Sequence, residues 1–352
     1  MGQVAVRILH LDAGPGAGPL TALLAEARRV NAERLAAGFR GAGASDVQVI
    51  SGPEDGKPFG TRLRQLAGDL EAGSGLIVLG SGSIPLAHPT DLAALVEVAG
   101  SGEHRALANN RYSADVIALG RSDVLARVPD LAADNALPRW LAEVGGYTVD
   151  DLRRRLRLGM DLDSPLDLLL IGRTQPGAEF EAIAARLAAL RDVAADRREE
   201  LLVAGRTSAA VLRWLERSTA CRVRAWVEER GLRASSSESL VTRRSPQRPP
   251  RSVLGLVLDD RGPDALGDIV ASLADGAFID SRVLLAHRHG PDESAWPGPE
   301  DRFASDLLLA DAVRDPWLRS LTSSARDAAI PIVLGGHSLV GPGLRLALRG
   351  RQ

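Results

Sequence analysis

Short apolar segments alternate along the chain with longer segments in which apolar residues recur at helical spacing. In the first half, strands are expected at residues 4–11, 47–50, 75–79 and 116–119, helices at 20–39, 61–70, 89–99, 137–144 and 149–156, and a last apolar segment at 166–171. This alternation is typical of βαβ units, in which helices cover a mostly parallel sheet. The pattern therefore predicts an α/β fold.

The same alternation continues in the second half. Residues 178–193 have alanines and leucines at helical spacing and are expected to form a helix that bridges the two halves. After this helix, strands are expected at 200–204, 223–228, 253–258, 278–286 and 330–334, and helices at 208–218, 264–274 and twice within 301–329. Residues 234–251 are rich in Ser, Arg and Pro, which predicts a mobile loop.

The length of the chain predicts two domains. With 352 residues it exceeds the roughly 250–300 residues beyond which a single hydrophobic core rarely grows. We predict a first domain at residues 1–172, a bridging helix within 173–198, and a second, smaller α/β domain at 199–352.

Composition excludes several classes of function. The net charge of -2 gives no general attraction to nucleic acid or to an anionic membrane, so an anionic ligand needs a local site. Cys221 is the only cysteine, which excludes an intramolecular disulfide and a zinc site built on several thiolates. No run approaches the ~20 apolar residues that span a bilayer, and the N-terminus leads directly into a strand. We expect a cytoplasmic protein with no membrane partner.

Three closely spaced carboxylates are the most informative local feature. Asp161, Asp163 and Asp167 lie in the segment MDLDSPLD at residues 160–167. Carboxylates at this density suit a hard cation such as Mg²⁺, which prefers oxygen ligands. Asp and Ser also cap helices, and Pro favours the first helical turn. Spacing alone leaves both interpretations open.

A glycine-rich loop and a single lysine could contact phosphate. Gly14, Gly16 and Gly18 precede the first expected helix, whose N-terminus would favour an anion. Two prolines in the same loop remove N–H donors, so a plain tight turn explains it equally well. Lys57, the only lysine, precedes another expected helix and could reach a phosphate or remain an exposed loop residue.

A polar run precedes the expected strand at 116–119. Asn109, Asn110, Arg111, Tyr112 and Asp115 are placed where an α/β sheet commonly recognises its substrate. The alternative is a turn whose side chains satisfy the local backbone groups.

The second half holds weaker candidates. Arg282, next to Asp280 in a segment expected to be a strand, requires a carboxylate partner. His287 and His289 would share one face of that strand and could bind a metal. Residues 335–338 resemble a nucleophile elbow, but no histidine follows them, so we predict a turn or a small anion site instead.

Two segments resemble the nucleotidyltransferases of the GT-A fold, particularly the guanylyltransferases that act on phospholactate and on molybdenum or corrinoid cofactors. These are residues 160–167 and the expected strand and turn at 75–86, which ends GSGSIPL. The resemblance implies a Rossmann-like mixed sheet in the N-terminal domain. It also implies a nucleoside triphosphate bound by Gly14, Gly16, Gly18, Lys57 and Ser83, a small phosphorylated acceptor, and Mg²⁺ held by Asp161 and Asp163.

The chain departs from that family at two positions. Ser83 occupies the place of the family's metal-binding Asp, and the loop at 12–19 lacks the family's Arg and Lys. No residue is therefore assigned to catalysis. The alternative function is a degenerate GT-A-like domain that binds a nucleotide without turnover or serves as a scaffold. A glycosyltransferase is a third possibility, but no isolated Asp-x-Asp motif beside a sugar-binding loop favours it.

Overall fold

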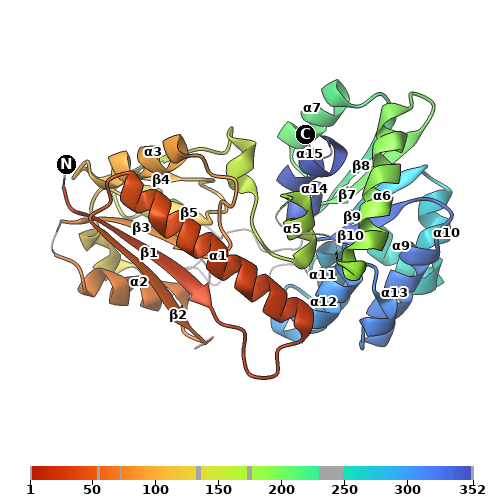
Figure 1. Cartoon of the computed structure of the whole chain (residues 1–352), viewed down its shortest axis with the longest axis horizontal. Helices are drawn as coiled ribbons and strands as arrows, with labels where there is room; N and C mark the ends of the chain where they lie inside the picture. Colours follow the sequence, from red (N-terminus) through yellow and green to blue (C-terminus); the bar gives the residue numbers. More distant parts are fainter. Residues whose placement is uncertain are drawn as a thin grey trace. The chain divides into compact units, whose positions relative to one another are not determined.

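The structure is a computed structural model that describes residues 2–53, 56–71, 73–131, 136–172, 177–229 and 249–349. It confirms the α/β class, with a six-stranded mixed sheet and a four-stranded parallel sheet. Among the described residues, the contacts divide the chain into two compact units. The first comprises residues 2–16 and 25–161, and the second comprises 17–24, 162–229 and 249–349 (Figure 1). The domain boundaries given above remain predictions.

The sheet of the first unit has the strand order β2-β1-β3-β5-β4-β6. Its strands are β1 (Val4–Leu11), β2 (Asp46–Gly52), β3 (Gly75–Gly80), β4 (Arg105–Ala108), β5 (Val116–Leu119) and β6 (Thr148–Asp151). Strand β5 runs antiparallel to both of its neighbours, and the other pairings are parallel. The parallel strands therefore end at one shared edge of the sheet, which we call the first carboxyl edge.

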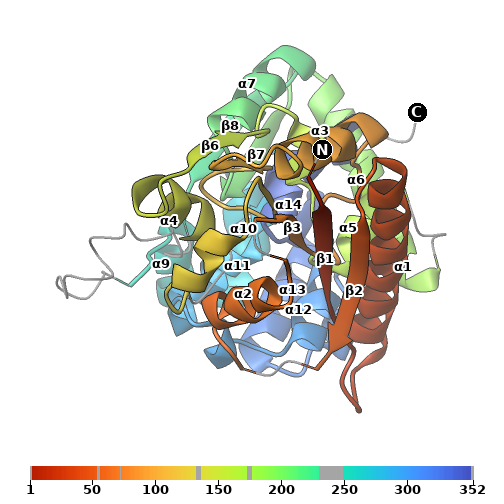
Figure 2. The ribbon, with the colours of Figure 1, turned by 90° about the vertical axis from the view of Figure 1, so that its left-hand side faces the viewer.

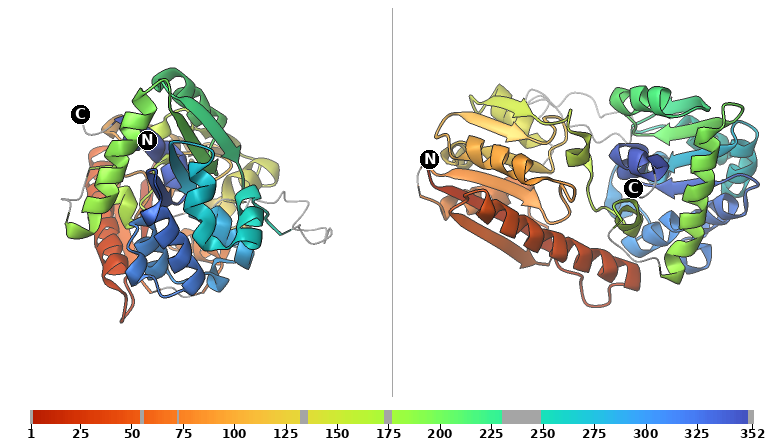
Figure 3. Two further views of the ribbon diagram at one scale, coloured as in Figure 1. Left: turned by 90° about the vertical axis from the view of Figure 1, so that its right-hand side faces the viewer. Right: turned by 45° about the horizontal axis from the view of Figure 1, so that its top comes forward.

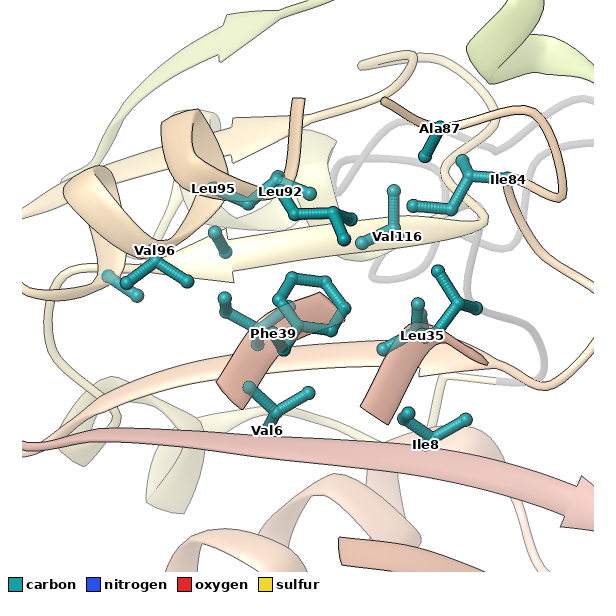
Figure 4. Close-up of a cluster of buried hydrophobic side chains, with 14 of the residues drawn as sticks. Val6, Ile8, Leu35, Phe39, Ile84, Ala87, Leu92, Leu95, Val96 and Val116 are labelled. Carbon is teal, nitrogen blue, oxygen red and sulfur yellow. The ribbon is translucent and has the colours of Figure 1, made fainter. Parts of the chain in front are cut away.

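Helices cover both faces of this sheet. They are α1 (Pro19–Gly41), α2 (Phe59–Gly68), α3 (Pro89–Ala99) and α4 (Leu137–Glu143). Because side chains alternate along a strand, Val6 and Ile8 point to the face covered by Leu35 and Phe39 of α1 (Figure 4). Ala5 points to the opposite face, which packs against α2 and α4. Figure 2 shows α1 and α2 on opposite sides of β1 and β2.

The sheet of the second unit has the order β10-β9-β7-β8 and is parallel throughout. Its strands are β7 (Glu200–Gly205), β8 (Arg222–Val227), β9 (Gly276–Asp280) and β10 (Ile332–Gly335). The helices are α5 (Pro165–Leu170), α6 (Ala178–Ala195), α7 (Ala209–Ser218), α9 (Val253–Arg261), α10 (Leu266–Ala271), α11 (Ser281–His289), α12 (Pro299–Asp306), α13 (Pro316–Asp327), α14 (His337–Val340) and α15 (Pro342–Arg349). Helix α6, expected to bridge the halves, packs on β7, β9 and β10 (Figure 3).

Several expected elements were wrong. Residues 253–258 form a helix, α9, and not a strand, because Leu254 and Leu258 bury one helical face and Ser252 caps the first turn. Residues 278–286 contain only the end of β9, after which Asp280 caps α11. Residues 149–156, expected to be helical, contain the end of β6, and β4 was not predicted. Short apolar runs fit a strand and a buried helix equally well, so periodicity alone does not separate them.

Part of the predicted loop at 234–251 lies outside the described residues. Among the residues that the structure does describe, none forms a helix that is both long and apolar enough to cross a membrane.

Candidate functional site

Ser83 lies in the turn after β3, and its side chain is already satisfied by the protein. Its Oγ donates a hydrogen bond to the carbonyl oxygen of Asp115 at 3.0 Å, and only 2% of the residue is exposed. The Ser83 backbone also pairs with Asp161 in an isolated antiparallel bridge. The Nδ2 of Asn31 donates to the carbonyl oxygen of Ser83 at 3.1 Å. Ser83 therefore ties the β3 turn to two neighbouring segments.

The next residue has an unusual backbone conformation. Ile84 has a φ of 43°, although a β-branched residue rarely adopts the left-handed region. Its side chain is fully buried, and Arg34 Nη2 donates to its carbonyl oxygen at 3.1 Å. Such backbone strain persists only where the surroundings hold it in place. The turn after β3 is consequently a rigid part of the first carboxyl edge.

The polar run before β5 is largely a self-satisfying turn. Asn109 is buried, and its Nδ2 donates to Asp115 Oδ2 at 2.6 Å and to the carbonyl oxygen of Leu158 at 2.9 Å. Its Oδ1 accepts the N–H of Asp115 at 3.0 Å. Asn110 Oδ1 accepts the N–H of Tyr112 at 3.0 Å. These contacts match the turn alternative for Asn109, Asn110 and Asp115.

Among the five candidate residues of that run, Tyr112 is exposed, whereas Asn110, Arg111 and Asp115 are partly exposed. Tyr112 is 59% exposed. The guanidinium carbons of Arg111 and Arg153 lie 5.6 and 5.1 Å from the centre of its ring. We call these three residues the arginine–tyrosine cluster. It combines an aromatic face with positive charge, a combination that suits an anionic or aromatic ligand.

The three carboxylates of residues 160–167 divide between the two units, and Asp167 is used as a helix cap. Asp167 is buried, and its Oδ2 accepts the N–H groups of Asp163 and Ser164, both at 2.8 Å, as part of a capping box on α5. Burial raises the pKa of Asp167 well above its usual range, and the nearby Asp163 adds to this effect. Asp161 belongs to the first unit, whereas Asp163 belongs to the second.

Within the described ranges, no three His, Cys, Asp or Glu residues approach closely enough to hold one metal ion. Mg²⁺ therefore remains a prediction.

The start of α1, which follows the glycine-rich loop, binds the carboxylate of Glu300. The Glu300 Oε1 accepts the N–H of Leu20 at 3.0 Å. Its Oε2 accepts the N–H of Thr21 at 2.9 Å and the Thr21 hydroxyl at 2.8 Å. Gly18 lies against the same carboxylate, because a Cβ there would be 2.2 Å from its carboxyl carbon. All four residues belong to the second unit.

The remaining predicted phosphate contacts are exposed. Nothing lies within 4 Å of the Cβ position of Gly14 or Gly16. Lys57 is exposed in the segment between β2 and α2.

Sequence reasoning missed a buried polar pair at the first carboxyl edge. The Nδ1 of His10, near the end of β1, lies 3.0 Å from Ser81 Oγ. Burial lowers the pKa of His10, although Asp12 opposes this shift. A histidine at the end of an apolar strand was the available signal.

Two ion pairs with fully buried carboxylates lie at the edge of the second sheet at which its strands end. Asp280 Oδ2 accepts from Arg206 Nε at 2.6 Å, and Asp306 accepts from both terminal nitrogens of Arg282 at 2.7 and 2.6 Å. Burial alone would raise the pKa of Asp280, but the neighbouring Arg206, followed by His337 and Arg282, lowers it below its ordinary value. The carboxylate partner predicted for Arg282 is confirmed, although Arg282 lies in α11 and not within a strand.

The histidines of α11 do not form the expected pair on a strand. The Nε2 of His287 lies 2.9 Å from Asp259 Oδ2, and its Nδ1 accepts the N–H of Ser252 at 3.1 Å. Both of its ring nitrogens are therefore used within the protein, so His287 and His289 are not a metal-binding pair.

Comparisons of the chain with models of protein families, with curated proteins and with solved structures gave no match. The resemblance to the nucleotidyltransferases therefore depends on the two sequence segments alone.

Proposed function

We propose that this chain binds a nucleotide or another small phosphorylated molecule. The observation that carries this proposal is the start of α1, where two backbone N–H groups and the Thr21 hydroxyl hold the carboxylate of Glu300. A phosphate presents oxygens of the same kind, and the N-terminus of a 23-residue helix favours negative charge. In this proposal the Glu300 carboxylate occupies the place of a phosphate until the ligand displaces it.

A separate observation in the first unit supports a nucleotide over a simple phosphate. The arginine–tyrosine cluster offers an exposed aromatic ring with two guanidinium groups over it. Rings of this kind stack on nucleobases, and arginines pair with phosphates.

Binding without turnover agrees better with the described contacts than a transfer reaction does. Ser83 occupies the place of the family's metal-binding Asp and uses its hydroxyl on Asp115, so its side chain is not placed to hold a metal on a triphosphate. The segment at 160–167 still favours a second candidate, nucleotidyl transfer. In that reaction a phosphorylated acceptor attacks the α-phosphate of a nucleoside triphosphate and releases pyrophosphate.

Calorimetric titration of the full chain with each of the four common nucleoside triphosphates, with and without Mg²⁺, tests the proposal. We expect binding to tighten about two- to fivefold in Glu300→Gln, because a competing charge at a helix N-terminus is removed. Glu181→Gln is the matched control, since Glu181 is exposed in the first turn of α6. Release of pyrophosphate would establish transfer. If no nucleotide binds either the unmodified chain or Glu300→Gln, the proposal of a nucleotide ligand is wrong.

A further inference from the structure

In the second sheet, the direction of the crossover connections reverses between β7 and β9. From β7 the chain passes to β8 on one side, and then returns to β9 and β10 on the other. Ligands of open parallel sheets bind outside the carboxyl ends of the strands, at the point where the direction of the crossovers reverses. Here the loops at that point begin at Arg206 after β7 and at Ser281 after β9.

An ion pair between Arg206 and Asp280 joins the ends of β7 and β9 at this position. Asp280 accepts from Arg206 through Nε at 2.6 Å and Nη2 at 3.0 Å. Gly205 permits this approach, because a Cβ there would lie 2.2 Å from Asp280 Cβ and its φ is 126°. The Arg206 side chain is 15% exposed, and no hydrogen bond from its Nη1 is found among the described residues. Arg206 is therefore fixed in place, with one nitrogen left to donate.

The next residue has a polar group that the folded chain does not satisfy. Thr207 is 8% exposed, and its Oγ1 is buried without a hydrogen-bond partner in the described part of the chain. A buried hydroxyl without a partner destabilises the fold, so natural proteins rarely retain one without a reason. Among the described residues only four side chains have such an atom, and Thr207 is the one in a β-strand-to-helix turn at the crossover reversal.

The same turn leads into a helix with open donors. Ser208 caps the ten-residue helix α7 by accepting the N–H of Val211. The N–H groups of Ala209 and Ala210 begin the helix and have no acceptor within it. Ser208 and Ala209 are exposed, so a ligand can approach from solvent. Donors from a guanidinium, a hydroxyl and two amides thus gather within five consecutive residues.

We propose that the β7–α7 turn is a second ligand site, which binds the oxyanion of a small phosphorylated or carboxylated molecule through Arg206, Thr207 and the first amides of α7. Asp280 already uses its oxygens on Arg206 and on the N–H of Arg282. The turn therefore offers donors and no free carboxylate, and this favours a ligand rich in acceptors. This site is independent of the anion position at the start of α1, which the Glu300 carboxylate occupies in the unmodified chain.

The test measures the thermal unfolding of the full chain against increasing inorganic phosphate, and separately against malonate, with chloride adjusted to constant ionic strength. We expect stabilisation by at least one of the two anions. Stabilisation by phosphate alone identifies a phosphorylated ligand, by malonate alone a carboxylated one, and by both the shared oxyanion chemistry.

Two threonine variants make the test specific. Thr207→Val keeps the shape of the side chain and removes the hydroxyl, so the anion affinity should fall about tenfold or more while the free protein still folds. Thr219→Val is the matched control at the other end of α7, where the hydroxyl donates to the carbonyl oxygen of Leu215 at 2.8 Å. Its anion affinity should be unchanged.

Three results would overturn the site. They are an absence of stabilisation by both anions, an affinity retained in Thr207→Val, and an affinity lost in Thr21→Val in place of Thr207→Val. The last of these would place the anion at α1.

Discussion

The edges at which the parallel strands of the two sheets end use their polar side chains in opposite ways. At the first carboxyl edge, two residues that the sequence predicts as site residues, Ser83 and Asn109, bond to neighbouring backbone groups. At the corresponding edge of the second sheet, Arg206 and Thr207 retain donors that the described chain does not use. Segments that resemble a known family can therefore serve a structural role. The β7–α7 turn, which resembles no motif, keeps unsatisfied donors that a ligand could use.

The largest loss of stability should come from breaking the ion pair between Arg282 and Asp306, at the carboxyl edge of the second sheet. Arg282→Met leaves the fully buried carboxylate of Asp306 without its partner, and we expect a loss of about 3–5 kcal/mol in the free energy of unfolding. Urea denaturation measures this loss. The double variant Arg282→Met, Asp306→Leu should recover most of it. A single variant as stable as the unmodified chain would contradict the role given to this pair.

A smaller loss should follow from removing the amide that organises the first edge. Asn109→Ala deletes two hydrogen bonds that Nδ2 donates and the bond that Oδ1 accepts from Asp115. At roughly 1 kcal/mol for each bond, the expected loss is about 2–3 kcal/mol in urea denaturation. Asn110→Ala is the matched control and should cost clearly less, because its side chain accepts one bond in a turn. Equal losses would show that the first edge is not organised by Asn109.

Removal of the Ser83 hydroxyl and removal of the Thr207 hydroxyl should change the stability of the protein in different directions. Ser83→Ala should destabilise the protein by about 1 kcal/mol, because the Asp115 carbonyl loses its donor. Thr207→Val should leave the stability unchanged or raise it, because it removes a buried hydroxyl that has no partner in the described chain. Thermal unfolding of both variants without added anions checks the signs. A reversal of the signs would contradict the comparison.

The smallest expected effect is the pH dependence of stability that His10 contributes at the first carboxyl edge. Because burial lowers the pKa of His10 in the folded protein, the unfolded chain binds more protons as the pH falls. The contribution of His10 to stability is therefore complete above the unfolded pKa of about 6.5 and is lost as the pH falls toward the folded value. Urea denaturation between pH 7 and pH 5 should show a shallower decline for His10→Asn than for the unmodified chain.

The α/β class and most helices could be predicted from the sequence because their apolar periodicity is local. The helical state of residues 253–258 could not, because a short apolar run becomes a helix or a strand according to its tertiary contacts. The ion-pair partner of Arg282 follows from the cost of burying a charge, but Asp306 could not be named without the fold.

The β7–α7 turn at the carboxyl edge of the second sheet could not be predicted as a site from the sequence. Arg206 and Thr207 belong to no recognisable motif, and their importance depends on Asp280, which is distant in sequence. Likewise, nothing in the sequence connects Glu300 with the start of α1.

The most direct test of the contrast between the edges is the rise in melting temperature that a saturating oxyanion produces in Ser83→Ala and in Thr207→Val, measured on the full chain. We expect Ser83→Ala to keep the rise seen in the unmodified chain and Thr207→Val to lose most of it. A rise lost in Ser83→Ala and kept in Thr207→Val would show that the first edge, and not the second, is where the anion binds.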